Sequence, residues 1–147
     1  MFKDYYQILG IPFTASTQEI KDAYRKMSLK WHPDKNPNID VTEIMQDINE
    51  AYKILYDEFS RARYDKEYEE FRCHKNLVRH YDCGQSWNYY YDIKDDYLKD
   101  DIYKARAYAH ELVNDFFDSL KESSKNATNG AIRGLKWFFM GKYKKTL

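Results

Sequence analysis

Two closely spaced prolines constrain the fold of this chain more than any other feature. Pro33 and Pro37 fall within the stretch 30–37, and each disfavours the α conformation at the residue before it, so a helix arriving from upstream must end there. Apolar residues recur at helical spacing on both sides of the stretch, upstream at Ile20, Ala23, Tyr24, Met27 and Trp31 and downstream at Ile44, Ile48, Ala51, Tyr52 and Leu55. The pattern predicts two amphipathic helices that pack as an antiparallel pair, with His32 and Asp34 in the turn at one end.

Three helix starts are marked by a capping residue followed three positions later by an acid or an amide. The pairs are Asp4 with Gln7, Ser16 with Glu19, and Asp40 with Glu43. Together with the apolar spacing, they predict helices at about 4–9, 17–30 and 41–57, followed by a short helix at about 59–68.

A second long apolar stripe predicts a helix at about 97–123. Its members are Ile102, Ala105, Ala109, Leu112, Val113, Phe116 and Leu120. Acidic residues crowd the first turn of this helix, where the helix dipole favours them. The stripe needs a partner surface, which could lie within the chain, on a second copy or on a client protein.

The order and content of four sequence blocks resemble the J domain of the DnaJ (Hsp40) co-chaperone family. The blocks are Asp4-Tyr5-Tyr6-Gln7-Ile8-Leu9-Gly10, Ile20-Lys21-Asp22-Ala23-Tyr24-Arg25-Lys26, Ile48-Asn49-Glu50-Ala51-Tyr52-Lys53-Ile54-Leu55 and Arg61-Ala62-Arg63-Tyr64-Asp65, with His-Pro-Asp between the second and the third. The resemblance covers about 4–65. It implies an all-α fold, in which a four-helix J domain with an antiparallel hairpin of its second and third helices precedes a mostly helical C-terminal region.

The domain division that we expect has three parts. Residues 1–70 form the J domain, 71–96 a Tyr-rich connecting segment, and 97–147 a helical C-terminal region with a basic, aromatic tail. Neither the Gly/Phe-rich linker nor the four Cys-x-x-Cys motifs of larger DnaJ proteins occur in this sequence.

The resemblance also implies which residues bind a partner. In J domains the basic face of the second helix docks on an acidic surface of the Hsp70 ATPase domain, and the His-Pro-Asp turn contacts Hsp70 near its interdomain linker. The matching positions are His32, Pro33, Asp34, Lys21, Arg25, Lys26 and Lys35. From the residues alone, the basic side chains would be an ordinary solvated helix face.

Enzymatic chemistry is not expected from this chain. His32 and Asp34 lack a nearby nucleophile elbow, a Gly-rich phosphate cradle or metal-ligand spacing. Cys73, His74, His80 and Cys83 lie close in sequence but without the spacing of a zinc finger, so unremarkable thiols are favoured over a metal site. We therefore expect no metal and no cofactor, because ATP and magnesium would belong to Hsp70.

Charge and targeting signals narrow the expected location and partners. The formal net charge is zero, which argues against a general nucleic-acid binder. The start of the chain lacks the pattern of a secretory signal, no apolar run approaches the roughly 20 residues of a membrane span, and two cysteines suit a reducing compartment. We expect a cytoplasmic protein.

The leading hypothesis is a co-chaperone in protein folding that activates the ATPase of Hsp70. Its C-terminal region would direct it to an unfolded client, a complex or a membrane surface. The basic, aromatic segment 131–147 could lie in a membrane interface, although folding back on the preceding helix is favoured. The alternative function is an adaptor that uses a J-like fold for protein assembly and does not activate Hsp70.

Overall fold

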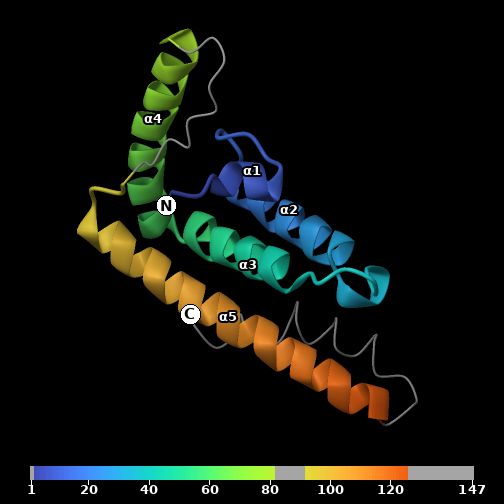
Figure 1. The fold of residues 1–147 in the computed structure, drawn as a ribbon. Helices are drawn as coiled ribbons and strands as arrows, with labels where there is room; N and C mark the ends of the chain where they lie inside the picture. Colours follow the sequence, from blue (N-terminus) through green and yellow to red (C-terminus); the bar gives the residue numbers. More distant parts are fainter. Residues whose placement is uncertain (1, 82–91, 126–147) are drawn as a thin grey trace.

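The computed structural model describes residues 2–81 and 92–125, and every regular element in these ranges is helical (Figure 1). The elements are α1 (Tyr5–Leu9), α2 (Thr17–Lys30), the 3-10 turn η1 (Pro33–Lys35), α3 (Thr42–Tyr56), α4 (Glu58–Tyr81) and α5 (Asp96–Lys125). The all-α fold expected from the sequence is confirmed.

The hairpin of α2 and α3 forms the centre of the fold. The two helices run antiparallel, and α1 and α4 close the end of the hairpin opposite to its turn (Figure 1). Tyr24 and Tyr52 stack between the helices with 4.1 Å between ring centroids, and the Tyr24 hydroxyl donates to Oδ1 of Asn49 at 2.8 Å. The bounds of α2 agree with the prediction at both ends.

Capping explains where the first helices begin. Asp4 accepts a hydrogen bond from the backbone N–H of Gln7 at 2.9 Å, and Ser16 and Glu19 form a reciprocal capping box, so both predicted caps are confirmed. Gly10 ends α1 in the left-handed region at φ 68°, a conformation that glycine adopts without steric cost.

The third predicted cap is wrong. The box of Asp40 with Glu43 does not form, because Asp40 Oδ1 accepts instead from the backbone N–H of Thr42 at 2.9 Å. Val41 takes the cap position, and its side chain has no polar atom to offer. As a result α3 starts one residue later than expected.

Helix α4 is much longer than the predicted helix at 59–68. It has 24 residues and continues to Tyr81. Contacts with the N-terminal segment stabilise the extension: Phe71 packs on Phe2 with 4.9 Å between ring centroids, and the Arg72 guanidinium lies over the rings of Phe13 and Tyr68. The expected boundary at residue 70 thus falls inside a helix, and the three-part domain division stays a prediction.

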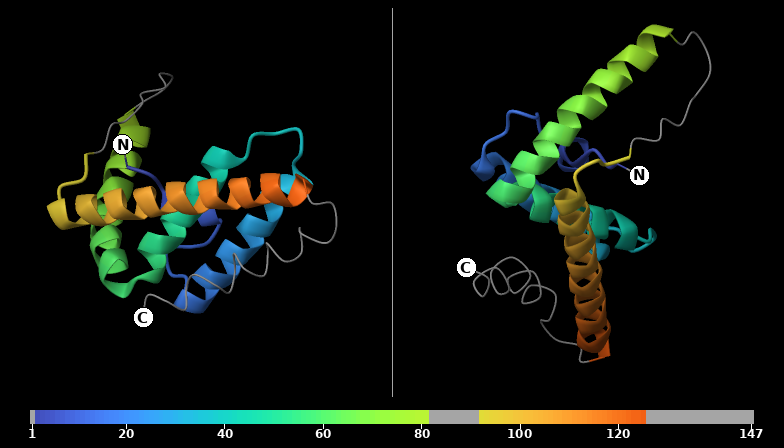
Figure 2. Two further views of the ribbon diagram at one scale, coloured as in Figure 1. Left: turned by 90° about the horizontal axis from the view of Figure 1, so that it is seen from below. Right: turned by 90° about the vertical axis from the view of Figure 1, so that its left-hand side faces the viewer.

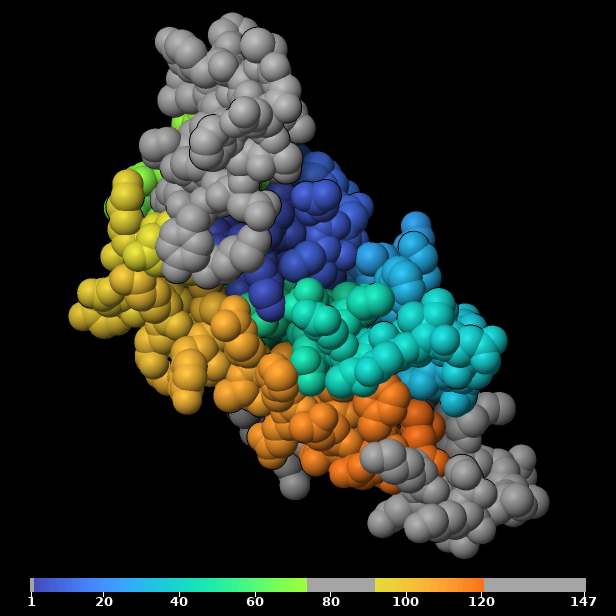
Figure 3. Space-filling model, in the orientation of Figure 1, coloured from blue at the N-terminus to red at the C-terminus, as the bar shows by residue number. Residues whose placement is uncertain are grey.

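Helix α5 finds its partner surface within the chain. It runs along the side of α3 that faces away from α1 and α2, as Figure 1 and the view from below in Figure 2 both show. In the space-filling view its surface meets that of the α3 region directly (Figure 3). The residues that α5 buries are Leu98, Ile102, Ala105, Ala109, Leu112, Val113 and Phe116. Six of these seven belong to the predicted stripe.

Hydrogen bonds from backbone N–H groups to the buried Glu67 side chain fix the start of α5. Glu67 of α4 is 5% exposed, and its Oε1 accepts from the backbone N–H groups of Lys94 and Asp95 at 2.9 and 2.8 Å. Asp95 then caps the helix by accepting from the N–H of Leu98 at 3.0 Å. These bonds hold the first turn of α5 against α4.

Some expectations lie outside the described residues. They include residues 82–91 of the Tyr-rich segment, the side chains of His74, His80 and Cys83, and the basic tail at 131–147. Among the helices that the structure describes, none combines the length and apolar character needed to cross a membrane.

Candidate partner-binding site

The turn between α2 and α3 is built on His32 and Pro33. After α2 ends, Pro33 opens the 3-10 turn, and Nδ1 of His32 accepts a hydrogen bond from the backbone N–H of Asp34 at 3.1 Å. Asn36 closes the turn, because its side-chain amide donates to the carbonyl oxygens of Lys30 and His32 at 2.9 Å each. Sequence analysis missed this role of Asn36, although an asparagine in a proline-rich turn is a signal for such side-chain-to-backbone bonds.

The His32 side chain lies inside the molecule. The residue is 4% exposed, and its ring meets that of Phe116 of α5 edge-on, with 5.3 Å between centroids and 75° between planes. Because Nδ1 accepts a hydrogen bond, the neutral ring carries its proton on Nε2, and this atom has no hydrogen-bond partner among the described residues.

The surroundings of His32 keep its ring neutral. Burial is the largest effect and lowers the pKa of His32; the Asp34 carboxylate, 3.7 Å from Nδ1, opposes it, and the charge of Lys35 adds to the lowering. The net pKa lies below the usual 6.5. A neutral ring is the form that can pack against Phe116 at the lowest desolvation cost.

The other residues of the turn are open to solvent. The Asp34 side chain is 47% exposed, Lys35 is exposed, and Pro33 is partly exposed. The turn therefore presents a carboxylate and an ammonium group at its surface while its histidine is covered.

The basic residues of α2 occupy the side away from its buried residues. Arg25 and Lys26 are exposed and Lys21 is partly exposed, whereas Ile20 and Tyr24 face the core. Arg25 pairs with Asp22 of the same helix at 3.5 Å, an exposed contact of little energetic weight. With a rise of about 1.5 Å per residue, Lys21 lies about 14 Å along the axis from the end of α2. The predicted residues thus form one compact turn and one extended helix face.

The comparisons with known proteins agree with this geometry. Residues 4–65 match the sequence profile of the DnaJ domain. The chain contains a DnaJ domain.

Two relatives that are about 50% identical to this chain align with it over little more than the DnaJ domain. Residues of the chain are 52% identical over 67 positions to a chaperone protein DnaJ of Chlorobium limicola, covering 45% of this chain and 17% of the relative. They are 54% identical over 70 positions to DnaJ homolog subfamily B member 5 of Mus musculus, covering 48% of this chain and 20% of the relative.

One similarity extends beyond the DnaJ domain. DnaJ homolog subfamily B member 7 of Mus musculus is 32% identical over 133 positions, which cover 89% of this chain and 42% of the relative. The chain spans less than half the length of each of these three curated relatives.

A buried carboxylate joins the DnaJ domain to α5, and sequence analysis missed it. Glu50 of α3 is 2% exposed; its Oε1 accepts from the Tyr5 hydroxyl at 2.7 Å and from Arg106 Nη2 of α5 at 3.1 Å. Its Oε2 accepts from Lys3 Nζ at 3.0 Å and from Arg106 Nε at 3.2 Å. Burial alone would raise the pKa of Glu50, but the hydrogen bonds from Arg106, Tyr5 and Lys3 outweigh it and hold the pKa below 4.5.

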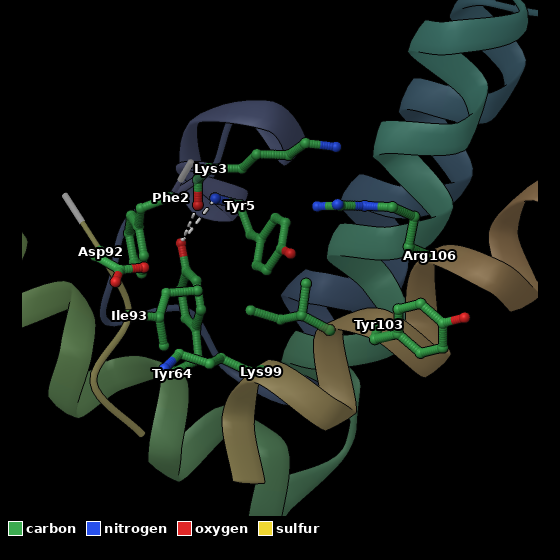
Figure 4. Close-up of a pocket in the computed structure, with 10 residues that line it drawn as sticks. Phe2, Lys3, Tyr5, Tyr64, Asp92, Ile93, Lys99, Tyr103 and Arg106 are labelled. Atoms are coloured by element: carbon green, nitrogen blue, oxygen red, sulfur yellow. Dashed lines mark hydrogen bonds between the residues drawn. The ribbon is translucent and has the colours of Figure 1, made fainter. Parts of the chain in front are cut away.

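A pocket of about 240 Å³ lies where α5 meets the start of the DnaJ domain and α4 (Figure 4). The Tyr64 hydroxyl donates to the carbonyl of Lys3 and accepts from the N–H of Tyr5, as the dashed lines in Figure 4 show. The cationic groups at its wall, Lys3, Lys99 and Arg106, each have an acidic partner. The pocket therefore lies at the edge of the α5 interface, and its cationic groups are engaged within the protein.

Among the residues that the structure describes, no three His, Cys, Asp or Glu side chains lie close enough to share an ion. Of the four residues weighed for zinc, Cys73 is exposed and forms no disulfide.

Proposed function

We propose that this chain is a co-chaperone that stimulates ATP hydrolysis by an Hsp70 partner. The residues that would make contact are His32, Pro33, Asp34, Lys21, Arg25, Lys26 and Lys35. The observation that carries the proposal is the His-Pro-Asp turn at the free end of a DnaJ-domain hairpin, next to a helix whose basic face points to solvent.

The two parts of this site suit two tasks. Exposed Arg25 and Lys26 can steer the chain toward an acidic surface and set its orientation, because opposite charges accelerate encounter. The turn can then bind the ATP-hydrolysing conformation of Hsp70 more tightly than its other conformations, which is what an allosteric activator must do. The chemistry itself, with ATP and magnesium, stays in the partner.

Single-turnover ATP hydrolysis by Hsp70 of the same organism tests this proposal. The full chain should raise the rate, and Asp34→Asn should abolish the increase because the exposed turn carboxylate is lost. Glu69→Gln, which removes an exposed carboxylate on α4, is the matched control and should behave like the unchanged chain. A stimulation that survives Asp34→Asn would contradict the assigned site.

The burial of His32 favours an adaptor as the second candidate function. A chain whose turn histidine is always covered would use its DnaJ domain for assembly without activating Hsp70. The two functions differ in one measurable respect, because an adaptor would bind Hsp70 or another partner but leave the rate of ATP hydrolysis unchanged.

The C-terminal region consists of α5, which the structure describes, and the residues after 125, which it does not. Because α5 packs on the DnaJ domain, we propose that recruitment of an unfolded client, a complex or a membrane surface belongs to residues after 125. Removal of residues 126–147 should abolish that recruitment in a client-aggregation assay or in flotation with anionic vesicles. It should leave stimulation of Hsp70 unchanged.

A further inference from the structure

A ladder of three tyrosine rings crosses from α2 to the end of α3. Tyr24 of α2 stacks on Tyr52 with 4.1 Å between ring centroids, and Tyr52 stacks on Tyr56, one helical turn further along α3, at 5.0 Å. Tyr24 and Tyr52 are buried, whereas Tyr56 is 42% exposed. The ladder therefore begins in the core between the two helices and ends at the surface.

The exposed end of the ladder lies next to the basic face of α2. The two helices run antiparallel, with Tyr24 opposite Tyr52. One turn nearer the end of α3, Tyr56 is therefore level with Lys21, which lies nearly one turn before Tyr24 on α2. The charge of Arg25 also acts on Tyr52: burial and the neighbouring Tyr56 raise the pKa of the Tyr52 hydroxyl to about 12, and Arg25 opposes them. A partly exposed aromatic ring thus continues the row of cations proposed to bind Hsp70.

Another exposed ring near the end of α3 belongs to a different surface. Phe59, in the first turn of α4, is 77% exposed and shares a helix face with Arg63. Arg63 lies over the ring of Tyr97 of α5, 5.3 Å from its centroid, and pairs with Asp101. Because α5 packs on the side of α3 that faces away from α2, Phe59 lies on the α5 side of the molecule. Tyr56 and Phe59 are therefore close in sequence but differ in the surface to which they belong.

Stacking prepares Tyr56 to bind a partner at low entropic cost. A tyrosine side chain has few torsion angles, and contact with the buried ring of Tyr52 restricts them further, so little freedom is left to lose on binding. Tyrosine and arginine are also the residue types that are enriched in binding hot spots. Exposed charges steer and orient a partner but add little affinity in water, so the ring offers an apolar contact that the basic face lacks.

We propose that Tyr56 is the apolar anchor of the Hsp70-docking face, and that its ring contacts an apolar side chain at the edge of the acidic surface that binds Lys21 and Arg25. This inference rests on the proposed function. It extends the docking face from α2 onto the end of α3 that lies away from the His-Pro-Asp turn. Because the turn contacts Hsp70 separately, the anchor determines affinity and not the rate of ATP hydrolysis at saturation.

Three substitutions at Tyr56 test the anchor in the full chain. Tyr56→Ala should raise the half-saturating concentration for stimulation of Hsp70 about fivefold, and Tyr56→Glu, which sets a carboxylate against an acidic surface, should raise it more than about tenfold. Tyr56→Phe keeps the ring and should restore the affinity. At saturation, each variant should still reach the rate of the unchanged chain, and urea unfolding of each confirms that the domain is folded.

Salt separates the anchor from the charges beside it. The loss of affinity in Tyr56→Ala should be the same at low ionic strength and at about 0.5 M salt, because an apolar contact is not screened. The loss in Arg25→Glu should shrink at the higher concentration. A loss in Tyr56→Ala that disappears in high salt would contradict an apolar contact.

Phe59→Ala and Phe59→Glu are the matched controls, because they make the same changes at an exposed ring on the α5 side of the molecule. Both should leave the half-saturating concentration unchanged, and an equal rise there would contradict a specific anchor at Tyr56. If Arg25→Glu weakens binding while folded Tyr56→Ala and Tyr56→Glu bind like the unchanged chain, the anchor is wrong even though the proposed function stands. If the unchanged chain does not stimulate hydrolysis, the proposed function itself fails.

Discussion

The imidazole of His32 packs edge-on against the phenyl ring of Phe116, a residue from the far end of the described chain, with 5.3 Å between the ring centroids. One contact thus joins the turn of a DnaJ domain to the apolar stripe of a helix that follows it. The stripe is occupied within the chain, so α5 needs no second copy or client to cover it.

The titration of His32 should report whether α5 is docked. In the full chain its NMR-measured pKa should lie below 6.5, and Phe116→Ala should raise it, because the ring then regains water. The docked state favours the neutral ring, so docking is strongest above about pH 6.5 and weakens as pH falls toward the docked pKa. The spectrum of His32→Gln assigns the resonance, and an unchanged pKa in Phe116→Ala would show that α5 does not bury the ring.

Glu50→Gln should destabilise the protein by about 1–3 kcal/mol, less than for a fully buried ion pair because Lys3 and Arg106 are partly exposed. Urea unfolding at pH 7 measures this loss. Since the folded pKa of Glu50 is lowered, its contribution is present above about pH 4.5 and is lost as pH falls through the folded pKa. The difference from the unchanged protein should therefore shrink in acid, whereas Glu43→Gln, at an exposed position of the same helix, should cost little at either pH.

Asn36→Ala should loosen the turn. The substitution removes an exposed hydrogen bond to the carbonyl of Lys30 and a partly buried one to the carbonyl of His32, and should cost about 1–2 kcal/mol. Amide hydrogen exchange should become faster in residues 31–36 and change little in α4. Asn38→Ala is the control in the same loop, where the side chain is exposed; an equal effect of both variants would mean that Asn36 has no special role.

Charge reversal on α2 should weaken the binding of Hsp70 in a salt-dependent way. Lys26→Glu and Arg25→Glu each replace an exposed cation on the proposed docking face, so affinity should fall about tenfold at low ionic strength and less at 0.5 M salt. Titration calorimetry at two salt concentrations measures both effects. Lys66→Glu makes the same change at an exposed position of α4 and should have little effect on affinity. An equal loss of affinity in this variant would show that binding depends on the net charge of the protein and not on a specific face of α2.

The parts of the fold that local chemistry decides were predictable from sequence. The prolines end α2, and the Ser16 capping box starts it, so its bounds were predicted at both ends. The cap at Asp40 was wrong because an aspartate can accept from the N–H two residues ahead as well as three, and sequence spacing does not decide between them. The extension of α4 was missed because its first additional turn packs on Phe2, which lies far away in sequence.

In the candidate site, too, features that depend on local sequence were predictable and features that depend on long-range contacts were not. Its residue types and its position at the end of a hairpin were predictable, because both depend on short-range patterns. The burial of His32 was not, since it requires the register of α5 on α3, and that register is fixed by long-range contacts such as Glu50 with Arg106. The predicted stripe of α5 indicated that a surface exists for it but not which one.

The extension of α4 bears on how a minimal fragment should be cut. The DnaJ profile ends at residue 65, yet Tyr68 stacks on Phe13 and donates a hydrogen bond to Asp4, and Phe71 packs on Phe2. A recombinant fragment that stops at residue 65 would therefore expose the aromatic rings around α1 to water and to other molecules of the same fragment. The unit that purifies well should be longer than the unit that sequence comparison delimits.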